Sequence, residues 1–530
     1  MKALFAIVIL ASFLRLYGLG SFPPSIYWDE AAIGYNAYSI AQTGRDEYGI
    51  KYPILFKSFN DFKLPGYIYL DSIFVKLFDL SPTTTRLPSA LSGTLAILGI
   101  YLIAKKLFDT NTAIFSALLL AISPWHLQFS RAAFEATISF TIIIFGILFM
   151  LYGQKNKFWA YISIPILFAS AYFYLAARLI SPLILFTFFW IFQKEIKKNL
   201  RVYIYGLIIA IVIVIPIIST SLSSSGQKHI KEVSIFEDKS IPASYVEASA
   251  KNQTILSRIF LNRRIPYIFE SFHKYSLHFS PGFLFFGDDP NARHRSAFHG
   301  NLYLFEIILL IIGFSVLAKY KDSKSKYFIL ALVLIAPLPA AFSQEAPHSL
   351  RTLPMLLPLS IVSALGAKHL WENLKVKIIM PFIIVIFFIN YLLGYYIVYP
   401  LRDSSAWGYG YQQLFTYLSQ IDNNYDRIVV TAYYWKPYIY YLYVNKIDPR
   451  IFQNNPDVQS IGKYRFGTTF WDSGGVDFDE ESIDKLKGNK TLLVLSEKEF
   501  EKLKGSKFKQ IKTISDYSGR NGIFEVGEWL

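Results

Sequence analysis

The sequence predicts a mainly α-helical membrane protein with about eleven transmembrane helices and a small α/β domain at its C-terminal end. Three observations lead to this prediction. The 530 residues are 53% hydrophobic and only 17% charged, whereas about 25% of residues are charged in an average soluble domain. Long apolar segments recur along the first three quarters of the chain. The remaining residues are more polar and contain short strand-like segments.

Eleven segments are candidates for membrane-spanning helices, because about 20 apolar residues cross a bilayer. They are 3–19, 88–107, 112–124, 135–152, 158–175, 179–193, 202–219, 302–319, 327–342, 350–367 and 377–399. The third and sixth segments are short, which is typical of tilted or partly re-entrant helices. The chain contains no cysteine, so disulfide bonds and thiolate metal sites are excluded.

Lysines cluster in alternate loops between these segments, as the positive-inside rule predicts for cytoplasmic loops. We therefore expect a plasma-membrane protein with its N-terminus inside, and the odd number of helices places its C-terminus outside. The long outer segments are then 20–87, 220–301 and the C-terminal region. The net charge of +15 follows from this topology and does not indicate a nucleic acid partner.

The first outer segment contains two predicted helices that lie on the membrane surface. Residues 29–43 form a helix that ends at Gly44, and residues 64–80 form a second helix with Pro65 in its first turn. Tyr67, Leu70, Phe74 and Leu77 are expected to share one face of the second helix.

Asp29 and Glu30 are adjacent carboxylates at the start of the first of these helices. One interpretation is that they cap the helix by accepting hydrogen bonds from its free backbone N–H groups. The other is that they form a catalytic site at the bilayer boundary. Spacing alone does not distinguish these interpretations.

The C-terminal residues 401–530 predict a small α/β domain outside the membrane, following a transmembrane domain of residues 1–400. Strand-like segments occur at 427–434, 491–495, 508–515 and 522–526, and helix-like segments at 409–421 and 480–487 alternate with them.

Other charged residues at the outer edge of the bilayer are candidate functional residues, because charge near lipid is costly. They are Asp61 and Lys63; Arg131 and Glu135; Arg178; Asp288, Asp289, Arg293, His294, Arg295 and His299 in GDDPNARHRSAFHG (287–300); and His348 and Arg351. Each has a structural alternative: a helix cap, a snorkelling side chain, an ion pair along one helix or an interface anchor.

Acids and cations gathered at one membrane face are suited to moving a group from a lipid phosphate. An acid can remove the proton from an acceptor hydroxyl group, and cations can stabilise the departing phosphate. Arginines bind phosphate through paired hydrogen bonds. Carboxylates and histidines can instead hold a divalent metal, and the candidates are Asp29, Glu30, Asp61, Asp288 and His294. Their spacing is not specific for a metal, so the sequence is compatible with a divalent metal but does not establish a cofactor requirement.

Four segments carry a resemblance to a known group: WDEAAIGYNAYSI (28–40), FNDFKLPGYIYL (59–70), TTTRLPSAL (83–91) and SPWHLQFSRAAFE (123–135). They resemble the membrane-embedded GT-C glycosyltransferases, and most closely the protein O-mannosyltransferase and lipid A aminoarabinose transferase group. The resemblance covers roughly residues 1–400 and is strongest over 20–185.

This resemblance implies transfer of a sugar from a polyprenyl-monophosphate donor, with inversion, to a glycan, lipid or protein acceptor outside the cytoplasm. Asp29 and Glu30 match the Asp-Glu pair of such enzymes, in which the Asp is the general base or positions the acceptor. Asp61, Lys63 and Pro65 match a glycine-glutamate-lysine-proline-proline motif loosely, so Lys63 is the first candidate to bind donor phosphate. Glu135 matches a further acid.

The remaining cations, Arg131, Arg178, Arg293 and Arg295, are phosphate-binding candidates by their chemistry, and His348 and Arg351 are supporting candidates. Two other functions are considered. A transporter or flippase for a lipid-linked glycan would carry charges near the bilayer midplane and an internal repeat, which the sequence lacks. An oligosaccharyltransferase would carry a tryptophan-tryptophan-aspartate motif, and Phe470-Trp471-Asp472 lacks its second tryptophan.

Overall fold

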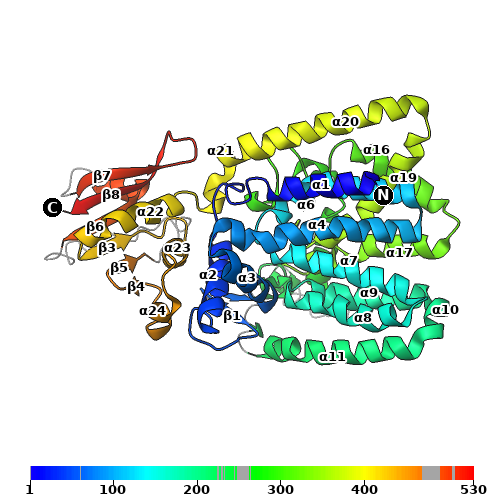
Figure 1. The fold of residues 1–530 in the computed structure, drawn as a ribbon, viewed down its shortest axis with the longest axis horizontal. Helices are drawn as coiled ribbons and strands as arrows, with labels where there is room; N and C mark the ends of the chain where they lie inside the picture. The colour runs from blue at the N-terminus through cyan, green and yellow to red at the C-terminus, as the bar shows by residue number, and fades with distance from the viewer. Residues whose placement is uncertain are drawn as a thin grey trace. The chain divides into compact units, whose positions relative to one another are not determined.

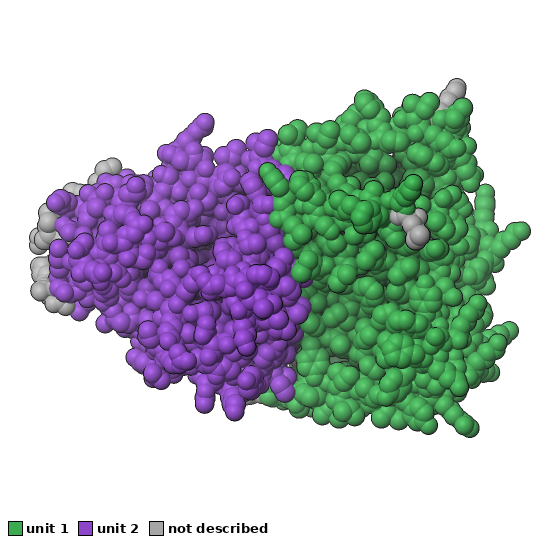
Figure 2. Space-filling view, in the orientation of Figure 1, with its two compact units in different colours: residues 1–17, 89–130, 134–394 green, residues 18–88, 131–133, 395–530 purple. Residues whose placement is uncertain are grey.

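The computed structural model describes residues 2–59, 61–223, 226–227, 231, 233–243, 245–247, 262, 264–467, 490–503 and 508–529. The chain divides into two compact units, coloured separately in Figure 2. Unit 1 comprises residues 1–17, 89–130 and 134–394, and unit 2 comprises residues 18–88, 131–133 and 395–530. Unit 2 therefore combines residues 18–88 with the C-terminal residues. The expected division into 1–400 and 401–530 stays a prediction.

Unit 1 is a helical bundle whose long helices run in roughly one direction (Figure 1). The longer helices are α1 (Lys2–Leu16), α4 (Pro82–Leu107), α5 (Thr110–Ile122), α6 (Pro124–Ser130), α7 (Glu135–Gly153), α8 (Lys157–Ala169), α9 (Ala177–Ile191), α11 (Leu200–Leu222), α15 (Arg264–Leu277), α16 (Glu306–Ala318), α17 (Ser323–Ile335), α19 (Leu356–Trp371) and α20 (Leu374–Leu393). The first residues of α4 belong to unit 2. Short helical turns between them are α10 (Gln193–Ile196), α18 (Leu338–Ala341), η1 (Ser170–Tyr172), η2 (Lys197–Asn199), η3 (Ile235–Glu237), η4 (Gly282–Phe286), η5 (Ala292–His294) and η6 (Leu353–Met355).

Glycines allow α16 and α19 to approach closely. A Cβ atom added at Gly313 would lie 2.0 Å from the Val362 carbonyl oxygen, and one added at Gly366 would lie 2.0 Å from the Leu309 carbonyl oxygen. Small residues at helix crossings let backbones pack directly, which is a common device in membrane bundles.

Six described helices are long and apolar enough to cross a membrane, or seven if the bent pair α5–α6 counts as one span. This pair bends by 56°, where Pro124 interrupts the backbone hydrogen bonding. The break lies at the end of the predicted span 112–124. All eleven predicted spans overlap helices, but the predicted count of about eleven is not confirmed. Helices such as α8, α9 and α16 have only 13 to 15 residues.

Residues 20–87 form the two helices expected from the sequence. In unit 2, α2 (Trp28–Thr43) ends at Gly44, whose φ of 67° is the left-handed conformation that glycine adopts most easily. The next helix, α3 (Pro65–Phe78), begins with its proline. A short antiparallel hairpin of β1 (Phe56–Ser58) and β2 (Asp61–Lys63) precedes it.

The buried face of α3 differs from the expected face. Tyr67 is buried as expected, but Leu77 is 68% exposed, and Ile68, Asp71 and Val75 are buried instead. Because α2 packs along α3, tertiary contacts select the buried side. This side includes a carboxyl group, Asp71, which the apolar pattern did not predict.

Asp71 is expected to make folding pH-dependent. Its side chain is fully buried, and neither carboxylate oxygen has a hydrogen-bond partner among the described residues. Burial therefore raises the pKa of Asp71 well above its ordinary value of 3.8. Between these two pKa values the folded state binds more protons than the unfolded state, so the free energy of unfolding falls as pH rises above about 3.8.

Unfolding of wild type and Asp71→Asn, measured from pH 4 upward, tests this expectation. The free energy of unfolding of Asp71→Asn, relative to that of wild type, should increase with pH. A difference that does not change with pH would contradict the ionisation of a buried Asp71. Asp79→Asn provides a control, because the effect of Asp79 on the free energy of unfolding has the opposite dependence on pH. The hydrogen bond from Lys446 lowers the pKa of Asp79, so its contribution to stability is lost as pH falls.

Unit 2 also contains a six-stranded sheet in the order β4-β5-β3-β6-β8-β7. Its strands are β3 (Arg427–Val430), β4 (Ser460–Ile461), β5 (Tyr464–Phe466), β6 (Thr491–Ser496), β7 (Phe508–Ser515) and β8 (Gly522–Trp529). Strand β3 runs parallel to β5 and β6, and the other pairs are antiparallel. Each of the four predicted strand segments overlaps one of these strands, but the segment 427–434 is longer than β3, which ends at Val430.

The remaining helical elements of unit 2 lie between residues 394 and 503. They are η7 (Gly394–Val398), which begins at the last residue of unit 1, α21 (Tyr399–Asp403), η8 (Ser404–Trp407), α22 (Tyr411–Ile421), η9 (Asp422–Asn424), α23 (Pro437–Val444), α24 (Pro449–Asn454) and α26 (Glu497–Leu503). The predicted helix at 409–421 corresponds to α22. The one at 480–487 and Phe470-Trp471-Asp472 lie outside the described residues.

Candidate active site

The two acids at the start of α2 have different surroundings. Tyr27 is the N-cap residue, and its backbone N–H donates to Glu30 Oε2 at 3.3 Å. Neither acid is therefore the N-cap, although Glu30 satisfies a free N–H group at the helix start. Glu30 is fully buried, whereas the Asp29 side chain is 26% exposed.

Glu30 forms a buried ion pair with Arg86 in unit 2. Arg86 Nε donates to Glu30 Oε1 at 2.9 Å, and Nη2 donates to Oε2 at 2.8 Å. Oε1 also accepts the backbone N–H of Ala133 at 2.8 Å. Arg86 additionally donates to three carbonyl groups, those of Leu19, Pro23 and Ser25. Protein groups thus occupy both Glu30 oxygens, which favours a structural role for this acid.

Asp29 is paired with Lys63, the last residue of β2. Lys63 Nζ lies 2.5 Å from Asp29 Oδ1, and the lysine side chain is 11% exposed. The hairpin positions the lysine, because Lys63 pairs with Phe56 across its two strands. A partly accessible carboxylate beside an ammonium group can accept a proton from one ligand and attract an anionic group of another. The side chain of Asp61 lies outside the described part of the structure.

Trp28, which precedes Asp29 in the chain, belongs to a group of aromatic side chains in unit 2. The ring centres of Trp28 and Trp435 are 5.7 Å apart in an edge-to-face arrangement, and the ring centres of Phe59 and Trp435 are 5.9 Å apart. Lys436 Nζ lies 4.4 Å from the centre of the Trp435 ring. Phe59, Trp435 and Lys436 have φ values of 61°, 68° and 47°, which are unfavourable for residues other than glycine. Such strain is concentrated at functional sites.

Arg131 also belongs to unit 2, where it is almost fully buried. Its Nε donates to the hydroxyl oxygen of Tyr395 at 3.2 Å, and its Nη2 donates to the Phe22 carbonyl at 3.2 Å. The guanidinium group lies 5.3 and 5.4 Å from the ring centres of Tyr395 and Tyr396. Glu135 begins α7 in unit 1.

In unit 1, Arg178 and Arg351 line one cavity of about 500 Å³. Arg178 Nη1 donates to Ser221 Oγ at 2.6 Å, and Arg351 Nη1 donates to Ser343 Oγ at 2.9 Å. Apolar side chains form most of the remaining wall: Leu175, Ala176, Leu179, Val233, Pro339 and Phe342. Two cations in an apolar cavity suit a ligand with an anionic head and a hydrocarbon chain.

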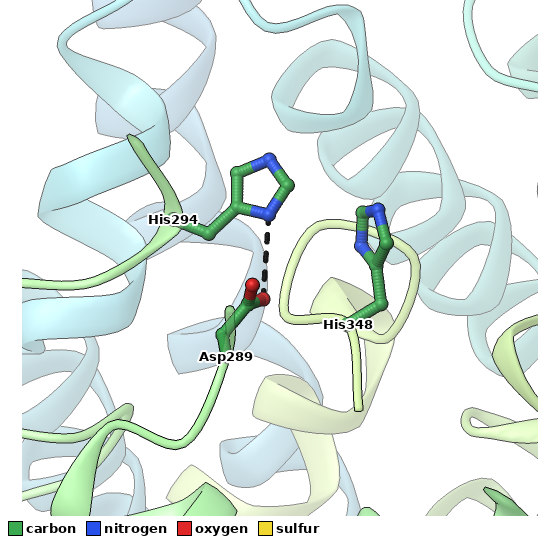
Figure 3. A group of neighbouring side chains, drawn as sticks. All are labelled: Asp289, His294 and His348. Atoms are coloured by element: carbon green, nitrogen blue, oxygen red, sulfur yellow. Dashed lines mark hydrogen bonds and ion pairs between the residues drawn. The ribbon is translucent and has the colours of Figure 1, made fainter. Parts of the chain in front are cut away.

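The 287–300 segment contributes a third group of residues, also in unit 1. Asp289 and His294 lie beside His348, and all three side chains are buried (Figure 3). Burial, with Arg351 and His294 nearby, lowers the pKa of His348 well below its usual range. Asp288 is exposed, so only His294 among the five predicted metal ligands belongs to this cluster.

The two arginines of this segment stand next to the cluster in the chain. Arg293 and Arg295 flank His294 and are half-buried. The Arg293 backbone carbonyl accepts a hydrogen bond from Gln128 Nε2 at 2.8 Å. The structure thus divides the predicted site residues between the units, with Asp29, Glu30, Lys63 and Arg131 in unit 2.

Arg86 was not predicted from the sequence as a site residue. It is fully buried and holds Glu30. The sequence did contain a reason to select Arg86, because this charged residue lies near the start of the long apolar helix α4. A charge near lipid is costly, and this argument, which selected Arg131, applies equally to Arg86. Its partner, 56 positions earlier, could not be recognised from the sequence.

Comparison with known proteins identifies a family match in part of the chain. Residues 63–219 match the family described as dolichyl-phosphate-mannose-protein mannosyltransferase. No curated protein matches the chain significantly by sequence.

Solved structures share the fold. ArnT from Cupriavidus metallidurans bound to undecaprenyl phosphate gives a TM-score of 0.58 at 13% identity, covering 99% of this chain and 97% of that chain. The Archaeoglobus fulgidus oligosaccharyltransferase in complex with zinc and sulfate gives a TM-score of 0.51 at 15% identity and covers 83% of this chain. This chain covers only 61% of that oligosaccharyltransferase. At these identities the likeness establishes the fold.

Proposed function

We propose that this chain is a membrane glycosyltransferase of the GT-C class that moves a sugar from a polyprenyl-monophosphate donor to an acceptor outside the cytoplasm. The family match over residues 63–219 and the fold shared with ArnT support this class. The observation that carries the proposal is the partly exposed Asp29–Lys63 pair, 2.5 Å apart, beside the buried Glu30–Arg86 pair. The first pair supplies reactive groups, and the second holds the start of α2 in place.

The reaction is a direct displacement at the anomeric carbon of the sugar. The acceptor oxygen forms a bond to this carbon as the bond to the phosphate oxygen breaks, which inverts the configuration. The proton of the acceptor hydroxyl goes to Asp29, and polyprenyl phosphate leaves next to Lys63. Orienting the acceptor hydroxyl by a hydrogen bond is a further contribution of Asp29 in this proposal.

Glu30 acts in this proposal as a positioning residue. Its two oxygens bind Arg86 and the backbone of Tyr27 and Ala133, so substrate reaches Asp29 instead. Trp28, Trp435 and Lys436 form the acceptor side. Aromatic faces and a cation suit a sugar or a peptide, which agrees with a role for residues 401–530 in acceptor binding.

The cavity with Arg178 and Arg351 in unit 1 is a second proposed binding site for a lipid phosphate, in addition to Lys63 in unit 2. ArnT, which shares the fold, was solved with undecaprenyl phosphate. Arg178→Met and Arg351→Met are each expected to raise KM for a polyprenyl-phosphate sugar about 10- to 100-fold, because a charge-assisted hydrogen bond contributes about 1.5–3 kcal/mol. Arg201→Met, at an exposed position of α11, is the control. An unchanged KM in both cavity variants would place the phosphate elsewhere.

Donor turnover tests the proposed function itself. The purified protein in lipid nanodiscs is offered a panel of polyprenyl-phosphate sugars with acceptor membranes, and released polyprenyl phosphate is quantified. Release with one sugar supports the proposal and identifies the donor. A protein that releases none, but moves lipid-linked sugar across a sealed vesicle, is a flippase.

A further inference from the structure

We propose that Asp289, His294 and His348 form a binding site for a divalent transition metal, with Zn²⁺ as the best fit. One ligand atom from each residue lies within 4.8 Å of the other two. Asp289 and His294 belong to the 287–300 segment, and His348 belongs to the loop before η6. The site lies within unit 1, next to the cavity that Arg351 lines, because the backbone N–H of Arg351 donates to His348 Nδ1 at 3.3 Å.

The three side chains point toward one another (Figure 3). His294 Nδ1 faces Asp289 Oδ2 at 3.3 Å, and the ring centres of His294 and His348 are 4.7 Å apart. Two imidazoles and one carboxylate form a ligand set typical of Zn²⁺ and related divalent ions. Metal–ligand bonds of about 2 Å require these side chains to move toward a common centre, because their ligand atoms are separated by up to 4.8 Å.

Backbone hydrogen bonds already orient the carboxylate. The N–H of Ser349 donates to Asp289 Oδ2 at 2.6 Å, and the N–H of Asn291 donates to Oδ1 at 2.9 Å. Second-shell contacts of this kind hold metal ligands in position and raise affinity. They also join the two segments, because Ser349 follows His348 directly.

A third histidine positions His348. The backbone N–H of His348 donates to His278 Nε2 at 3.1 Å, and His278 Nδ1 bonds the Lys274 carbonyl oxygen at 2.8 Å. Since His278 directly follows α15 (Arg264–Leu277), a metal at the proposed site would fasten the 287–300 segment to a loop that α15 already holds. We therefore infer a metal that joins these two segments, with three protein ligands and a fourth coordination position left for water.

Metal content and thermal stability test the site without any sugar donor. The full chain in nanodiscs is stripped with EDTA, dialysed against micromolar Zn²⁺ and analysed by mass spectrometry for bound metal. We expect one Zn²⁺ per chain and a rise in the unfolding temperature of several degrees. The variants Asp289→Asn and His294→Gln should lose both effects. His273→Ala, at an exposed position of α15, should retain them.

Cobalt provides a readout on the wild type, so the test does not depend on the folding of a variant. One equivalent of Co²⁺ should give visible absorption bands that Zn²⁺ then abolishes. The proposal would be overturned if the wild-type protein bound neither Co²⁺ nor Zn²⁺. It would also be overturned if the variant with both Asp289→Asn and His294→Gln bound these ions as fully as wild type. Because these measurements contain no donor, a failure of glycosyl transfer leaves their result unaffected.

Discussion

Replacing Asp29 with asparagine should lower the rate of sugar transfer by about 10²- to 10⁴-fold, the usual contribution of a positioned general base. Asparagine keeps the size of the side chain but cannot accept a proton from the acceptor hydroxyl. Because Asp29 is 26% exposed and Glu30, not Asp29, accepts the N-cap hydrogen bond, the substitution should leave α2 intact.

The measurement is polyprenyl phosphate release at saturating donor, together with an unfolding curve for each protein. Asp79→Asn is a matched control, because Asp79 forms another solvent-accessible ion pair with a lysine, Lys446, in unit 2. It should retain wild-type turnover. Full turnover by Asp29→Asn would show that Asp29 has no catalytic role. Loss of turnover together with unfolding of the variant would indicate that Asp29 has a structural role.

Replacing Arg86 with methionine should destabilise the protein by about 3–5 kcal/mol, which is typical when one partner of a buried ion pair is removed. The substitution leaves the Glu30 carboxylate buried without its guanidinium partner. It also removes donors from the carbonyl groups of Leu19, Pro23 and Ser25, so the chain before α2 loses its attachment to α4.

Reversible unfolding in lipid or detergent measures this loss. Lys368→Met is the control, because the Lys368–Asp109 pair has a similar distance of 2.8 Å but is 35–38% exposed. Such pairs contribute about 0–1 kcal/mol. The double variant Glu30→Met with Arg86→Met should be less destabilised than Arg86→Met alone, since no unpaired charge remains buried. Equal losses for Arg86→Met and Lys368→Met would refute the assigned role of the pair.

Local signals determined the elements that carry the site. Gly44 ends α2 because glycine adopts the left-handed conformation easily, and Pro65 begins α3 because a first-turn residue needs no free N–H group. Both constraints act within a few residues, so the sequence alone predicts them. The apolar segments and the Asp29–Lys63 candidates were likewise visible in the sequence.

Tertiary structure alone decided which charges meet. The pairing of Glu30 with Arg86, the shared cavity of Arg178 and Arg351, and the Asp289 cluster all join residues far apart in the chain. The burial of Asp71 likewise follows from the packing of α2 on α3. Sequence spacing describes only neighbours along one element, whereas ion pairs, cavities and metal sites depend on how separate elements pack in space.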